Sequence, residues 1–242
     1  MFENEKGVAI PVARAAGASL ALGLLAWLNF GGVKTPQNFR VTGDLVQNAA
    51  VLAFVLLLLL PDGGTLRRAA RLGLVVMAYD FFLETTAAYA GWWFPLGGTQ
   101  WPPLLVVPLE MVLSFGLVGA STGVLFAAPE LVRREAEKPP ARRTWPHRWL
   151  LRPFRNPRTD PAWILAYVAL VSLVGTRGDY SAGPEVWVPG EGWHPALTFL
   201  AWLSGGLVAY AAHAWLKRRG GAASPTHVLN ARSPASPNPG TM

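Results

Sequence analysis

Apolar runs separated by short polar stretches fill most of the chain between residues 9 and 216. A helix needs about 20 predominantly apolar residues to cross a hydrocarbon core about 30 Å thick. The pattern therefore predicts an all-α protein, an integral membrane bundle of about six transmembrane helices. We expect these helices at 9–31, 44–60, 72–93, 104–127, 161–176 and 195–216, with proline and glycine clusters in the gaps between them.

Basic residues predict how this bundle is oriented. Lysines and arginines gather in three stretches, at 67–71, 129–160 and 217–219. The alternate gaps hold only Lys34, Arg40 and Arg177. With an even number of spans, the three basic stretches and both termini lie on one side, which the positive-inside rule assigns to the cytoplasm. We therefore expect a protein of the cytoplasmic membrane with both termini in the cytoplasm.

The same pattern divides the chain into two parts. Residues 1–219 form the predicted transmembrane domain, and 129–160 is its cytoplasmic basic loop. The tail 220–242 is rich in small, polar and proline residues, a composition that favours disorder.

Composition supports the membrane interpretation and excludes several other classes. The chain is 52% hydrophobic and 14% charged, whereas soluble domains carry about 25% charged residues. The net charge of +7 comes from stretches between apolar runs, which indicates contact with anionic lipid headgroups and no nucleic-acid partner. With no cysteine and only four histidines, we expect no disulfide, no metal site and no cofactor.

Three carboxylates inside the predicted spans are the candidate chemistry. Asp80 and Glu84 lie four residues apart, so they share one helix face at a separation of about 6 Å along the axis. Glu110 lies at a similar depth in the next span. Burial and mutual repulsion disfavour ionisation, so at least one of the three is expected to be protonated at neutral pH. Intramembrane acids serve in catalysis, in proton or ion pathways, or in hydrogen bonding between helices.

Asp80, then Gly91-Trp92, a glycine-containing turn and "VPLEMVLSF" (107–115) resemble the repeated unit of the integral-membrane lycopene cyclases. The resemblance covers about 40 residues, from 79 to 118. It implies a redox-neutral enzyme whose acids protonate a terminal double bond of a linear carotenoid. The membrane-bound carotenoid hydratases have a similar plan, with a glutamate in one helix and a V-P motif that opens the next.

The chain departs from the cyclase pattern in two ways. Met111 follows Glu110 where the family has a second glutamate, and no second copy of the motif appears in the last two spans. Glu84 can supply the missing acid, the reaction can differ, or an identical or different partner chain can complete the site.

The predicted function is carotenoid or isoprenoid modification by acid-initiated cyclisation, with Glu110, Glu84 and Asp80 as the catalytic acids. The expected substrate-binding residues, which line an apolar site or offer aromatic faces to a cation, are Trp92, Phe82, Phe115 and Asn48. For the tryptophans, a position in the interfacial belt is the competing interpretation. A hydratase, in which water captures the same cation, and a small proton-coupled transporter that uses the same acids are the alternative functions.

Overall fold

The computed structural model describes residues 41–96, 106–139, 160–182 and 187–222, together with four positions between 17 and 23. Its helices are α2 (Val41–Leu59), α3 (Gly63–Tyr89), α4 (Leu109–Phe126), α5 (Ala128–Glu137), α7 (Asp160–Ala182) and α8 (Pro195–Ala222), and its strands are β1 (Trp93–Pro95) and β2 (Trp187–Pro189). The predicted all-α class is confirmed. The first expected span, most of the basic loop and nearly all of the predicted tail lie outside the described residues.

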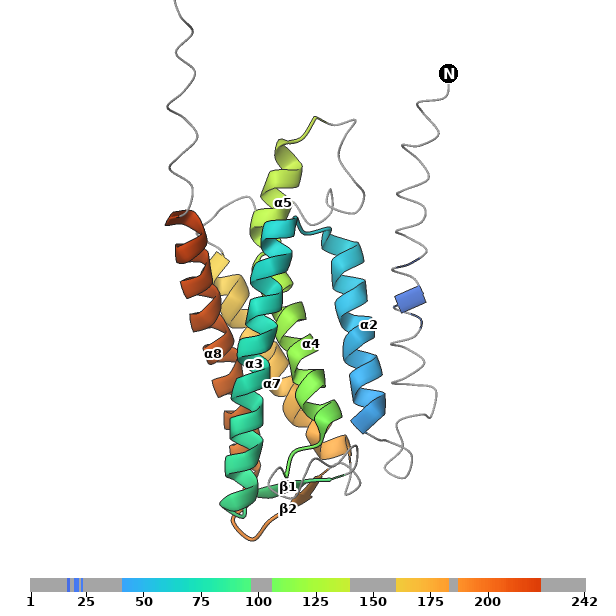
Figure 1. Cartoon of the computed structure of the whole chain (residues 1–242), viewed down its shortest axis with the longest axis vertical. Coiled ribbons are helices and arrows are strands. Elements are labelled where there is room, and N and C mark those ends of the chain that lie inside the picture. Colours follow the sequence, from blue (N-terminus) through green and yellow to red (C-terminus); the bar gives the residue numbers. More distant parts are fainter. Residues whose placement is uncertain are drawn as a thin grey trace, which may run out of the picture.

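Five long helices, α2, α3, α4, α7 and α8, run along the long axis of the molecule (Figure 1). The short helix α5 lies at one end of the bundle and the two strands lie at the other. Helix α4 packs against α2, α3 and α8, and α8 also packs against α3 and α7. The helices therefore surround a common interior.

The number of spans is smaller than expected within the described residues. Three helices are long and apolar enough to cross a membrane, namely Leu109–Phe126, Asp160–Tyr180 and Pro195–Arg219. In α2 the apolar segment Asp44–Leu59 is shorter than these three spans. Helix α3 carries three arginines near its start and two acids near its end, and these charges lower its mean hydropathy. Of the five expected spans that fall on described residues, these three are long and apolar enough to cross a membrane, and α2 and α3 are helices of the same bundle.

The chain leaves α3 through a turn at Gly91. Gly91 has a φ of +68°, in the left-handed region that glycine occupies without strain. The N–H groups of Trp92 and Gly91 bond the carbonyls of Ala87 and Ala88, the pair of bonds that defines a Schellman C-cap. The turn leads directly into β1, which pairs antiparallel with β2 so that Trp93 faces Pro189. This small sheet was not expected from the hydropathy pattern.

Helices α3 and α4 meet along a seam of small residues. A Cβ at Gly119 would lie 2.6 Å from Val76 Cβ, and one at Gly123 would lie 2.8 Å from Ala69 Cα. A Cβ at Gly73 would lie 2.7 Å from the carbonyl oxygen of Gly116. Glycine at these positions lets the two backbones approach closely, as in small-xxx-small contacts of membrane helices. The close approach of α3 and α4 therefore depends on these glycines.

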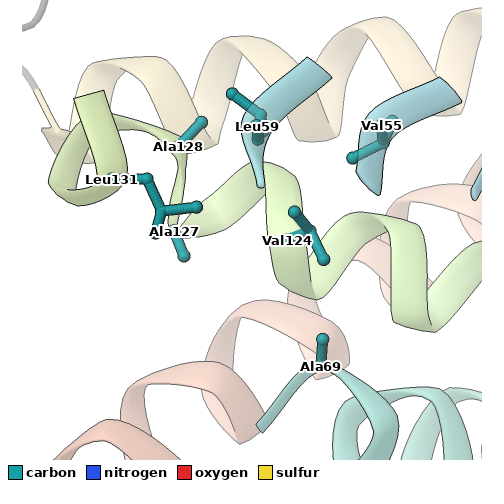
Figure 2. Packing of buried hydrophobic residues seen from close by; sticks show 7 residues of the cluster. All are labelled: Val55, Leu59, Ala69, Val124, Ala127, Ala128 and Leu131. Carbon is teal, nitrogen blue, oxygen red and sulfur yellow. The ribbon is translucent and has the colours of Figure 1, made fainter. Parts of the chain in front are cut away.

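The packed core lies toward the α5 end of the bundle. Figure 2 shows one cluster in which side chains of α2, α3, α4 and α5 meet; its buried members are Val55, Leu59, Ala69, Val124, Ala127, Ala128 and Leu131. A second cluster joins α3, α4, α7 and α8 around Leu72, Phe126 and Val168. Large apolar side chains on the outside of α7 and α8, such as Leu170 and Leu207, are exposed, as expected of helices that face lipid.

Ion pairs tie the helices together at the α5 end. Arg133 contacts both carboxylate oxygens of Asp160 at 2.8 and 2.6 Å, and so anchors the start of α7. Arg134 bonds Asp62, the N-cap of α3, at 2.8 Å, and Lys217 of α8 lies 3.3 Å from Glu130. These contacts gather the ends of α3, α7 and α8 around α5.

Candidate functional site

A cavity of about 650 Å³ lies between the five long helices and the two strands. This volume is within the range of about 300–1,000 Å³ that is typical of small-molecule sites. Along α7 the lining extends from Tyr167 to Asp179, which corresponds to about 18 Å at 1.5 Å per residue. The volume divided by this length gives a mean cross-section of roughly 36 Å², so the cavity is longer than it is wide.

Four carboxylates from three helices line this cavity: Asp44 of α2, Asp80 and Glu84 of α3, and Asp179 of α7. All four lie in the half of the cavity nearer the strands. Coulombic interactions link Asp80 to Glu84 and Asp179, and link Asp179 to Glu84 and Asp44. Arg177 is the one lysine or arginine among the described lining residues. The cavity therefore has an acid end and a largely apolar end.

Two of these acids accept hydrogen bonds from indole N–H groups. Trp93 Nε1 in β1 donates to Glu84 Oε2 at 2.7 Å. Trp202 Nε1 in α8 donates to Asp179 Oδ2 at 2.6 Å. An indole N–H is a donor only, so each contacted carboxyl oxygen acts as an acceptor and does not carry a proton there.

Asp80 differs from these two acids. Its side chain is buried, with 3% of the residue exposed, and its Oδ2 has no hydrogen-bond partner among the described residues. The Oε1 atom of Gln47 and the hydroxyl of Ser121, both on the cavity lining, are in the same situation. Buried polar atoms without a partner are uncommon in folded proteins, and they are frequent at functional sites. Asp80 therefore presents a free carboxyl oxygen to the cavity.

The predicted substrate-binding residues are divided between the cavity and the outer surface. Phe115 and Asn48 line the cavity, and Asn48 Nδ2 donates to Ser114 Oγ at 2.6 Å. Phe82 is 68% exposed on the outside of α3, where its ring contacts Phe81. Trp92 stacks beside Trp93 and is not among the described residues that line the cavity.

Glu110 lies outside the cavity that holds the other two predicted acids. Met77 packs against Gly116, and Val76 against Gly119, in an antiparallel register that puts Glu84 and Glu110 at similar heights. Height alone does not make them neighbours. Glu110, half-buried in the first turn of α4, is not among the described residues that line the cavity, whereas the following Met111 is. The cavity groups Glu84 with Asp80 and Asp179, and a joint role of Glu84 and Glu110 stays a prediction.

Sequence reasoning missed Asp179 and its partner Trp202. The fifth span was expected to end at residue 176, which put Asp179 in an outer loop, but α7 continues to Ala182. A span ending at 176 has only 16 residues, fewer than the roughly 20 that cross a membrane, and this shortfall was the available signal. No comparable signal identifies Trp202, because tryptophans are common at membrane interfaces.

The site contains no cluster that would bind a metal ion. Within the described ranges, no group of three or more histidine, aspartate or glutamate side chains is arranged to hold one. The arrangement offers instead carboxyl groups beside an apolar, aromatic-lined space. Comparison of the chain with protein-family models, with curated proteins and with solved structures finds no match.

Proposed function

We propose that this protein binds an extended, apolar isoprenoid chain in the cavity and protonates one of its terminal double bonds. The observation that carries this proposal is the buried Asp80 carboxyl, whose free oxygen faces a long, mainly apolar cavity. A neutral carboxyl in an apolar site is the acid that protonation of a carbon–carbon double bond requires. The resemblance to membrane lycopene cyclases, which begins at Asp80 and covers residues 79 to 118, points to the same chemistry.

The proposed step balances within the site. The O–H bond of a neutral carboxyl breaks, its proton forms a C–H bond at one alkene carbon, and a tertiary carbocation and a carboxylate result. Attack by a neighbouring double bond closes a ring, and loss of a proton to the carboxylate restores the acid. Aromatic faces such as those of Phe115 and Trp202 stabilise a cation.

Hydration is the second candidate outcome, and a specific observation favours it. Gln47 Oε1 and Asp80 Oδ2 both lack a hydrogen-bond partner among the described residues and line the same cavity. Each of these atoms can accept a hydrogen bond from a water molecule that enters the cavity. Its oxygen can then bond to the cation, and loss of a proton to the carboxylate gives a tertiary alcohol.

The orientation in the membrane follows from the basic residues. Every described lysine and arginine except Arg177 lies toward the α5 end of the bundle. By the positive-inside rule we assign this end to the cytoplasm and the strands to the outer side of the cytoplasmic membrane. The acid end of the cavity is then near the outer surface.

The test is conversion of a linear carotenoid by the full chain, expressed in a host that accumulates lycopene, with pigments analysed by chromatography. Asp80→Asn and Glu84→Gln keep the size of each side chain but cannot deliver a proton. Because general acid catalysis contributes about 10²–10⁴-fold, we expect each variant to lose at least tenfold in product at matched expression. Glu191→Gln, at an exposed position in the turn before α8, is the matched control and should retain conversion.

A third variant, Glu110→Gln, distinguishes the acid that the resemblance indicates from the acids that line the cavity. The resemblance makes Glu110 the principal acid, whereas the cavity places Asp80 and Glu84 at the reacting end and Glu110 outside it. We expect Glu110→Gln to retain more product than Asp80→Asn. Loss in Glu110→Gln alone would refute the assignment to the cavity acids. A wild-type chain that converts no isoprenoid, yet acidifies vesicles through Asp80, would replace the enzyme with the proton-coupled transporter.

A further inference from the structure

We propose that Trp202 is a positioning residue of the site, which fixes the Asp179 carboxylate and forms the aromatic wall beside the acids. The proposal rests on the proposed function, since it assigns a role within the same reaction. Neither residue belongs to the segment that resembles the lycopene cyclases. Trp202 contacts Asp179 of α7 and Phe115 of α4.

The contacts to Asp179 come from two tryptophans. Trp202 Nε1 donates to its carboxylate at 2.6 Å, and Trp187 Nε1 in β2 donates to its backbone carbonyl at 2.9 Å. The side chain and the backbone of Asp179 are therefore held from different elements. This arrangement holds the carboxylate at a fixed place relative to Asp80, with which it interacts electrostatically.

Gly175 explains how the indole reaches this acid. A Cβ at Gly175 would lie 2.3 Å from Trp202 Cδ2 and 2.4 Å from Cε2, distances that real Cβ atoms do not show. The middle of the indole thus lies directly on the α7 backbone, one turn before Asp179. Glycine at this position lets Trp202 cross α7 and point its N–H at the carboxylate. Any side chain there displaces the ring.

The opposite edge of the indole contributes to the cavity wall. The rings of Phe115 and Trp202 lie with centroids 5.3 Å apart at 37°, and both residues line the cavity. Tryptophan attracts cations more strongly than phenylalanine or tyrosine does. Trp202 therefore combines two roles: it donates a hydrogen bond to the Asp179 carboxyl group, and it offers a π face beside the position of the carbocation.

The first experiment removes the N–H and keeps a ring. Trp202→Phe should lower kcat by about tenfold, because the buried hydrogen bond that holds the Asp179 carboxyl group is lost, while KM changes less than about twofold. Asp179→Asn, which keeps a weaker acceptor, should lower kcat as well, and the loss in the double variant should be smaller than the product of the two single losses, since both changes act on one interaction. Trp215→Phe is the matched control on the same helix, exposed and stacked on Arg219, and should retain wild-type kinetics.

The second experiment tests the geometry without activity. Gly175→Ala should shift the indole band of Trp202 in ultraviolet resonance Raman spectra toward a weaker hydrogen bond. Gly178→Ala, where an added Cβ meets nothing within 4 Å, should leave that band unchanged. The loss of thermal stability caused by Gly175→Ala should disappear when Trp202 is replaced by Ala. A Gly175→Ala protein with an unshifted band and wild-type stability would refute the role of Gly175.

The proposed reaction and the positioning role of Trp202 can be refuted independently of each other. A wild-type chain without activity on any isoprenoid, but with the expected Raman shift, refutes the reaction and leaves the Trp202–Asp179 contact established. An active wild type with additive losses in Trp202→Phe and Asp179→Asn refutes the positioning role and leaves the reaction standing.

Discussion

The seam between α3 and α4 gives a prediction whose magnitude follows from the structure. A Cβ at Gly119 would lie 2.6 Å from Val76 Cβ and 3.0 Å from Gly73 Cα, so the two helices must separate to admit it. A Cβ at Gly116 would meet only Met77, at 3.4 Å or more, which is an ordinary contact. Gly119→Ala therefore overpacks the seam, and Gly116→Ala does not.

Comparing these two variants isolates the steric contribution to the free energy of unfolding. Replacing glycine by alanine inside a helix stabilises it by about 0.5–1 kcal/mol, and this gain is the same at both positions. Overpacking a close contact costs about 1–3 kcal/mol. We therefore expect Gly119→Ala to be less stable than Gly116→Ala by about 1–3 kcal/mol, with Gly116→Ala at or above the wild type.

The assay is reversible unfolding of the purified protein in mixed micelles, with increasing fractions of a denaturing detergent, followed by far-ultraviolet circular dichroism. The two variants should have the same helical signal before the transition and different midpoints. Equal midpoints for Gly119→Ala and Gly116→Ala would refute the close approach of α3 and α4, and with it the rotation of α4 that turns Glu110 away from the cavity acids.

Two further predictions concern the α5 end. Arg133→Gln should destabilise the protein by about 1 kcal/mol, because a paired contact to both oxygens of Asp160 is lost; a double-mutant cycle with Asp160→Asn measures this, and a coupling energy near zero would contradict it. The backbone N–H of Thr65 lowers the pKa of the Asp62 carboxyl below its usual 3.8, so the stability it contributes is present above pH 3.8 and is lost as the pH falls through the lowered value. Unfolding midpoints between pH 5 and pH 2 should therefore fall less steeply in Asp62→Asn, which keeps the N-cap, and parallel curves for the two proteins would contradict this.

Much of the fold follows from the sequence. Apolar runs and proline–glycine clusters predicted the helices to within a few residues for α2, α4 and α8, because the length of an apolar segment is a property of consecutive residues. The sequence also predicted that the basic residues gather at one end of the bundle, and the described ones, except Arg177, lie at the α5 end. The end of α3 was expected at residue 93, whereas the helix ends at Tyr89 and Gly91 forms the left-handed turn that follows it.

The candidate site depended on the tertiary structure. Asp80 and Glu84 could be proposed from their spacing alone, because a helix puts residues four apart on one face. Whether Glu110 joins them depends on the rotation of α4 about its axis, which is set by the glycine seam and not by depth in the membrane. Asp179 and Trp202 lie on other helices and meet only because α7 continues past its apolar segment and Gly175 lets the indole cross it. Hydropathy describes each segment separately, whereas a cavity is formed by faces of several helices, and packing alone decides which faces meet.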